Sequence, residues 1–111
     1  MKFILVSLFL LSLSGHVDAA EKMDGMGIGV RTCAKFADDM RTTQGAEGIY
    51  FTWAQGFMSG VNSMLAAGKH RDLGGKSVEA EQSFIREFCD QRPLARHLNA
   101  VEALFHTLPN L

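Results

Sequence analysis

The chain has 111 residues, with 11 Lys and Arg against 12 Asp and Glu, and its formal net charge is −1 at pH 7. This balance excludes the basic excess of nucleic-acid-binding proteins, and without a polybasic cluster the chain is not expected to act at a membrane surface. The length allows one small domain with a modest core.

The first segment has the pattern of a secretory signal peptide. Lys2 supplies a positive charge, residues 3–13 are an apolar run, and Val17 and Ala19 place small residues at a cleavage site. The apolar run is about eleven residues long, whereas a membrane span needs roughly 20. We expect residues 1–19 to be a cleaved leader, with an uncleaved anchor as the alternative. The mature protein is then periplasmic, with no stable membrane insertion.

Residues 20–30 contain several glycines and methionines without periodicity. Such a composition is typical of a mobile N-terminal arm. The helical domain is expected over residues 31–111.

The first helix is predicted over residues 32–40, with Thr32 as its N-cap. Asp38 and Asp39 are expected to face outward. The inward stripe contains Cys33, Phe36, Ala37 and Met40.

The central helix is predicted over residues 50–67 and is closed by Gly68. Gly56 and Gly60 are four residues apart on one stripe, and each glycine in a helix costs roughly 1 kcal/mol relative to alanine. We therefore expect another helix to cross closely there. Asn62 is expected to hydrogen-bond the backbone of a loop. The apolar face contains Tyr50, Trp53, Ala54, Phe57, Val61, Met64 and Leu65.

Two further helices complete the domain. Ser77 caps the third, whose first turns hold Glu79 and Glu81 and so favour the helix dipole. Its stripe contains Val78, Phe84, Ile85, Phe88 and Cys89. Pro93 opens the fourth helix and Pro109 follows its end. That helix shows Leu94, Leu98, Val101, Phe105 and Leu108 at helical spacing. The fold class is therefore all-α, a small four-helix orthogonal or bundle-like domain.

Two cysteines in a small exported protein predict one disulfide, between Cys33 and Cys89. The bridge would join the start of the first helix to the end of the third and close a loop of about 56 residues. The chain-entropy model gives roughly 4 kcal/mol of stability for such a loop, as an upper figure. Two free thiols or two metal ligands are the alternatives.

The candidate binding surface is aromatic, and ordinary core packing is its alternative. It contains Tyr50, Trp53, Phe57, Phe84 and Phe88. His97 and His106 lie too far apart along one helix to share a metal, but both could titrate between pH 5 and 7. His70 and Asp72 are expected to form a solvated surface pair. No catalytic residue, metal site or cofactor is predicted. Residues 56–60 lack the strand and spacing of a nucleophile elbow.

The pattern resembles the HdeA/HdeB-like family of small periplasmic helical proteins. The likeness is carried by Thr32-Cys33 with Phe36, by Trp53 with its two glycines, and by the segment from Ile85 to Pro93. It implies one disulfide and an acid-stress chaperone that binds unfolding proteins. A weaker likeness, through Gly56, Gly60 and Asn62, is to the Tai-type immunity proteins of type VI secretion, which implies a specific protein partner. A homodimer is a further expectation.

Overall fold

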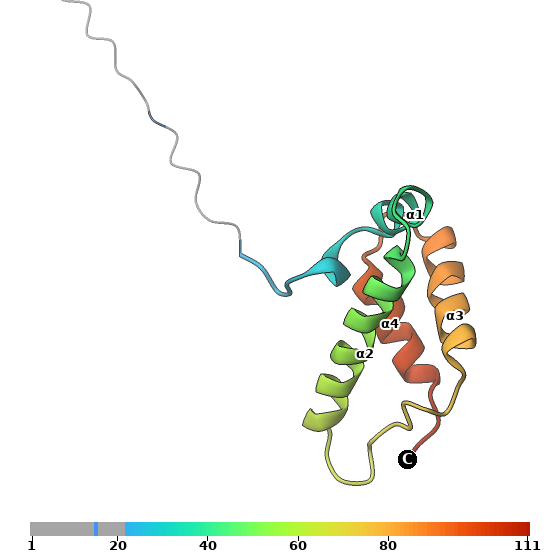
Figure 1. The fold of residues 1–111 in the computed structure, drawn as a ribbon. Helices are drawn as coiled ribbons and strands as arrows, with labels where there is room; N and C mark the ends of the chain where they lie inside the picture. Colours follow the sequence, from blue (N-terminus) through green and yellow to red (C-terminus); the bar gives the residue numbers. More distant parts are fainter. Residues whose placement is uncertain (1–14, 16–21) are drawn as a thin grey trace, which may run out of the picture.

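The computed structural model describes residue 15 and residues 22–111, which form four α-helices and a short 3₁₀-helix (Figure 1). The elements in chain order are η1 (Ile28–Val30), α1 (Cys33–Thr42), α2 (Ala46–Met64), α3 (Val78–Gln91) and α4 (His97–Thr107). Extended pairing in this part of the chain is limited to two isolated bridges. The all-α prediction is confirmed there, whereas the predicted leader falls, except for Gly15, outside the described residues.

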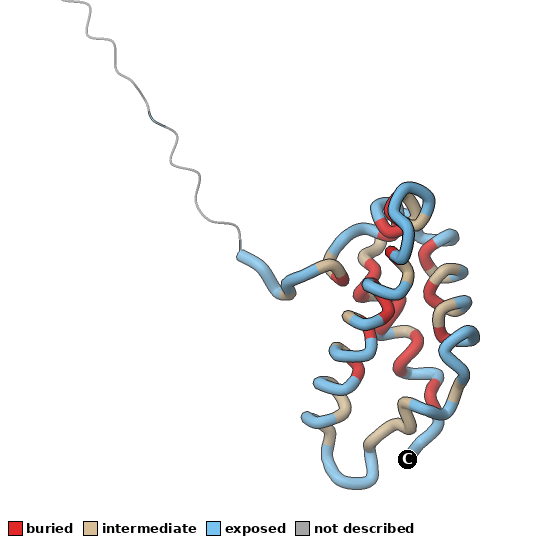
Figure 2. Tube along the Cα trace, in the orientation of Figure 1, coloured by how far each residue is buried: buried red, intermediate tan, exposed pale blue. Residues whose placement is uncertain are grey.

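Helix α4 lies between α2 and α3, and α1 crosses one end of these three helices (Figure 1). The buried side of each helix faces the others, and the outer sides are exposed (Figure 2). The core contains Cys33, Phe36, Tyr50, Phe51, Ala54, Met58, Ile85, Cys89, Ala100, Val101, Leu104, Phe105 and Leu108. Within residues 15 and 22–111, no helix combines the length and apolar character needed to cross a membrane.

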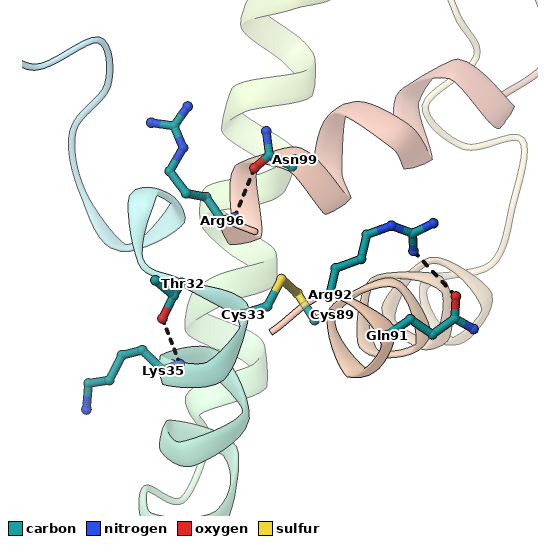
Figure 3. The surroundings of a disulfide bond; sticks show 8 residues. All are labelled: Thr32, Cys33, Lys35, Cys89, Gln91, Arg92, Arg96 and Asn99. Atoms are coloured by element: carbon teal, nitrogen blue, oxygen red, sulfur yellow. Dashed lines mark hydrogen bonds between the residues drawn. A yellow bond between two sulfur atoms is a disulfide. The ribbon is translucent and has the colours of Figure 1, made fainter. Parts of the chain in front are cut away.

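The predicted disulfide is confirmed. Cys33, the first residue of α1, is bonded to Cys89 in the last turn of α3, with their Cα atoms 4.8 Å apart (Figure 3). Both cysteines are buried. The bond therefore ties the crossing helix α1 to the C-terminal end of α3.

Two of the predicted helix starts are correct because their caps are local. Thr32 Oγ1 accepts a hydrogen bond from the Lys35 amide at 3.1 Å, and Ser77 Oγ accepts one from the Ala80 amide at 3.1 Å. Each bond satisfies a backbone N–H that has no partner within its helix.

The C-terminal end of α2 differs from the prediction, since the helix stops at Met64 and not at Ala67. The Asn62 side chain makes two hydrogen bonds to the Arg71 main chain, to its oxygen at 2.9 Å and from its amide at 2.8 Å. These bonds hold the following loop back against α2, as predicted for Asn62. Gly68, with φ of 80°, lies within that loop and does not cap α2, so its predicted role is wrong.

Helix α4 begins at His97 rather than at Pro93. The preceding residues form a turn whose carbonyl oxygens serve the start of α1, and the Cys33 amide donates to the Ala95 oxygen at 2.7 Å. The turn thereby satisfies N–H groups of α1 that a longer α4 would leave unpaired. Leu94, predicted as part of the apolar stripe, is 91% exposed.

The predicted close crossing at Gly56 and Gly60 is wrong. Both residues are exposed, and a Cβ atom added to either would meet none of the described residues within 4 Å. The core of α2 lies instead on the side of Ala54 and Met58. The two glycines therefore lie on an open face of the helix.

Candidate functional site

Tyr50 is part of the core and not of a binding surface, which corrects the prediction. Its side chain is 1% exposed, and its ring packs against Phe36 and His97, each with a centroid distance of 4.9 Å. Its hydroxyl donates to Asp39 Oδ2 at 2.6 Å. Tyr50 thus joins α2 to α1.

Trp53 is half-buried beneath the N-terminal segment. Its indole Nε1 donates to the Met26 oxygen at 3.3 Å, and a Cβ atom on Gly29 would overlap its ring. Asp24 accepts a hydrogen bond from the Arg96 guanidinium at 2.8 Å, which ties the same segment to the start of α4. We call residues 24–30 the strap. In the structure these residues of the predicted arm lie against the domain, because glycine lets their backbone lie directly on the ring, and their mobility in solution stays a prediction.

Phe57 stacks on Trp53, with ring centroids 5.4 Å apart and planes 10° apart. Beyond the strap, Phe57 lines a groove of about 440 Å³ between α2 and α4. The groove is lined by Phe57, Val61, Leu65, Glu102, Phe105 and His106. Its walls are mainly apolar, and its two polar residues lie on α4. We call it the α2/α4 groove.

Phe84 and Phe88 line a second groove, of about 350 Å³, on the other side of α4. The Arg92 guanidinium lies over the Phe88 ring, 4.3 Å from its centroid, and Ala103 is the residue that α4 contributes. Glu102 in the first groove and Ala103 in the second are adjacent on α4. Of the single aromatic surface predicted from the sequence, Phe57 lines one groove and Phe84 and Phe88 line another, whereas Tyr50 and Trp53 line neither.

His97 is buried at the start of α4, directly behind Trp53. Its ring lies among those of Phe36, Tyr50 and Trp53, and neither ring nitrogen has a hydrogen-bond partner in the described part of the chain. Burial lowers the pKa of His97 to about 4. The predicted titration between pH 5 and 7 is therefore wrong for His97. Its spacing of four residues from Val101 is the sequence signal for its buried position.

Asp39 faces the core side of α1 and not solvent, which also corrects the prediction. Its carboxylate pairs with Lys35 Nζ at 2.7 Å and with Arg31 Nη1 at 2.9 Å, besides accepting the Tyr50 hydroxyl. Hydrogen bonds from these groups, of which the bond from Lys35 has the largest effect, lower the pKa of Asp39 to about 2. The four-residue spacing of Lys35 and Asp39 is the only sequence signal for this cluster.

Within residues 15 and 22–111, no three His, Cys, Asp or Glu side chains gather as metal ligands would. His70 Nε2 lies 3.1 Å from the Leu65 oxygen, so its ring is engaged by the loop that follows α2. The features that stand out are thus apolar grooves, a strap over Trp53 and a buried imidazole behind it.

Comparisons with protein families, with curated proteins and with solved structures give no match to this chain. Its function has to be inferred from the chemistry of its own surface.

Proposed function

We propose that the protein is a periplasmic, non-enzymatic binding protein that acts as an acid-stress holdase of the HdeA/HdeB type. The leader pattern of residues 1–19 and the resemblance to that family support the proposal. The disulfide is compatible with an extracytoplasmic location, since such bonds persist in oxidising compartments. The clients would be unfolding proteins that bind the exposed aromatic side chains.

The observation that carries the proposal is the position of His97 behind Trp53. At neutral pH the imidazole is uncharged and the strap covers the indole. As the pH falls, the unfolded chain takes up a proton that buried His97 resists, so stability declines. Protonation of Asp24 also removes its attraction to Arg96, which holds the strap in place.

Loosening of the strap and of α4 would expose Trp53 beside Phe57 and so extend the α2/α4 groove, which is already open in the folded state. The disulfide between Cys33 and Cys89 would keep α1 and α3 joined in this open state. Self-repulsion of the protonated chain, which keeps ten of the 11 Lys and Arg once Lys2 is removed with the leader, would oppose collapse and keep the complex in solution.

The proposal is tested by light scattering of an aggregation-prone client enzyme at pH 2–3 and at pH 7. We expect suppression of aggregation only at the acidic pH. Trp53→Ala should weaken suppression, whereas Leu94→Ala, which removes an exposed apolar side chain that lines neither aromatic groove, should not. If a several-fold molar excess of the protein fails to suppress aggregation at pH 2–3, the proposal is wrong.

A specific partner-binding role, such as neutralisation of a secreted toxin by an immunity-type protein, is the second candidate. The α2/α4 groove favours it, because this groove is open in the folded state and needs no acid to form. This role predicts one stoichiometric complex at neutral pH. Affinity capture from the periplasm of the source organism tests it, and the absence of a stoichiometric partner would count against it.

A further inference from the structure

Glu81 is a buried carboxyl group that the proposed function does not use. Its residue is 3% exposed, although a glutamate in the first turns of a helix is ordinarily on the surface. Oε1 is completely buried and accepts no hydrogen bond from the described residues. Burial raises the pKa of Glu81, and the positive charge of Lys76 opposes that effect. A buried acceptor without a partner costs about 1–3 kcal/mol, and more when it is charged.

Glu81 lines a groove of about 340 Å³ between α2, the loop before α3 and α3 itself. The groove has both polar and apolar walls. Gln55 and Ser59 contribute from α2, whereas Met58, Leu73 and Val78 provide apolar contact. We call it the Glu81 groove. Its shape suits a side chain with an aliphatic stem and a polar head.

Lys76, the nearest cation, does not neutralise Glu81 by direct contact. Its Nζ donates to Thr107 Oγ1 at 2.9 Å and lies 5.8 Å from the centroid of the Phe84 ring. Its ammonium group is therefore held by Thr107 of α4, although Lys76 also lines the Glu81 groove. Among the described residues no ion pair is made by Glu81, so the carboxylate lacks a counter-charge within its own chain.

We propose that the Glu81 groove is a binding site for a lysine or arginine side chain of a partner protein. The cation would supply the hydrogen bonds and the charge that Glu81 lacks, because charge-assisted pairs are the strongest available to a carboxylate. Gln55 and Ser59 would form the polar rim. The apolar wall would contact the methylene stem, since lysine and arginine side chains commonly bury their stems along apolar surface. Because Oε1 is buried, a head group can reach it only if the groove wall moves.

This site is separate from the strap and the α2/α4 groove. Gln55 and Ser59 follow Trp53 and Phe57 by two residues each, which is a rotation of about 200° around the axis of α2. The two surfaces consequently lie on opposite sides of that helix. Binding at Glu81 needs neither acid nor release of the strap, so it stands or fails independently of the holdase proposal.

The test uses the folded protein, as the mature chain, at pH 7 and two-dimensional ¹H–¹⁵N NMR. The probes are the acetylated, amidated tripeptides Gly-Lys-Gly and Gly-Arg-Gly, with norleucine and citrulline peptides as neutral controls of similar shape. We expect saturable shifts of the amide signals of Gln55, Ser59 and Leu73 with a charged peptide only. Equal shifts with the neutral peptides, or no saturable shift with either charged peptide, would overturn the proposal.

Glu81→Gln keeps the shape of the side chain and removes its charge, and it should reduce the affinity by about tenfold or more. This variant is expected to fold, because it removes a buried charge. Glu79→Gln makes the same change at an exposed position in the same helix and should leave the affinity unchanged. An equal loss in both variants would mean a general charge effect and would contradict a site at Glu81.

Discussion

At the scale of single residues, His97 places an ionisable ring among aromatic side chains. Its pKa is about 4 in the folded protein against an ordinary value of 6.5, so the unfolded chain binds the proton first as the pH falls. Stability is therefore full above about pH 6.5 and declines towards pH 4, by a total of about 3 kcal/mol.

His97→Phe tests this contribution, because phenylalanine keeps an aromatic ring and cannot take up a proton. Urea unfolding at pH 7 and pH 4.5 should show a smaller difference in unfolding free energy for the variant than for the wild type. His106→Gln, an exposed position, is the control and should keep the wild-type difference. A variant with unchanged pH dependence would show that His97 is not the group responsible.

Asp39 acts in a lower pH range. Its pKa of about 2 lies below the ordinary value of 3.8, so its stabilising contribution is present above about pH 4 and is lost as the pH falls towards 2. Asp39→Asn should lower the melting temperature at pH 7, with the difference from the wild type vanishing near pH 2. Asp38→Asn, whose ion pairs are exposed, should have little effect. Circular dichroism melts across this range provide the measurement.

At the scale of elements, the strap depends on the close contact between Gly29 and the Trp53 ring. Gly29→Val puts a side chain where the indole lies, so the strap should detach while α1 to α4 remain folded. We expect a red shift of tryptophan fluorescence at pH 7 without loss of the helical circular dichroism signal. Gly48→Val, where a Cβ meets open space, should leave the emission unchanged. An unshifted emission maximum in the Gly29 variant would mean that the strap does not cover Trp53 in solution.

On the open face of α2, substitutions are expected to stabilise the protein. Because no part of residues 22–111 approaches Gly56 or Gly60, alanine at either position should raise the helix stability, by up to about 1 kcal/mol each. Thermal or urea unfolding of the two variants measures this gain. A loss of stability in the isolated protein would mean that another chain or segment packs closely there, as two glycines in a helix first suggest.

The parts of the fold that sequence patterns predict are those set by near neighbours. Thr32 and Ser77 cap helices through bonds to residues three positions on, and the paired cysteines need only an oxidising compartment and one partner each. The strap and the start of α4 depend on contacts between segments distant in sequence. Arg96 bonds Asp24 across 72 residues, and no local periodicity encodes that pairing.

The candidate site follows the same distinction. Helical spacing places Trp53 and Phe57 on one face of α2, and they stack there. Tyr50 lies instead on the core side of α2 with Ala54 and Met58, where its hydroxyl bonds Asp39, eleven positions earlier on another helix. A buried aspartate and a buried histidine are exceptions to the usual distribution of polar residues, so hydrophobic patterns alone could not locate them.

At the scale of the whole molecule, the titrating groups have opposing effects. His97 and Asp39 favour unfolding as the pH falls, because their pKa values are lowered in the folded protein. Burial raises the pKa of Glu81, so protonation of this residue favours the folded state. Loss of structure should therefore be gradual from pH 7 to pH 2 rather than confined to one narrow range.

The disulfide determines how far that loss can proceed. It closes a loop of 56 residues, for which the chain-entropy model gives roughly 4 kcal/mol, a large share of the stability of a domain this small. Circular dichroism from pH 7 to pH 2 should show residual helix at pH 2 in the oxidised protein and unfolding at a higher pH after reduction. A Cys33→Ser/Cys89→Ser variant controls for the reductant and should match the reduced protein. If oxidised and reduced proteins lose their helices along the same curve, the bond between α1 and α3 does not hold the acid state together, and the holdase mechanism loses the constraint that keeps its exposed grooves on one compact molecule.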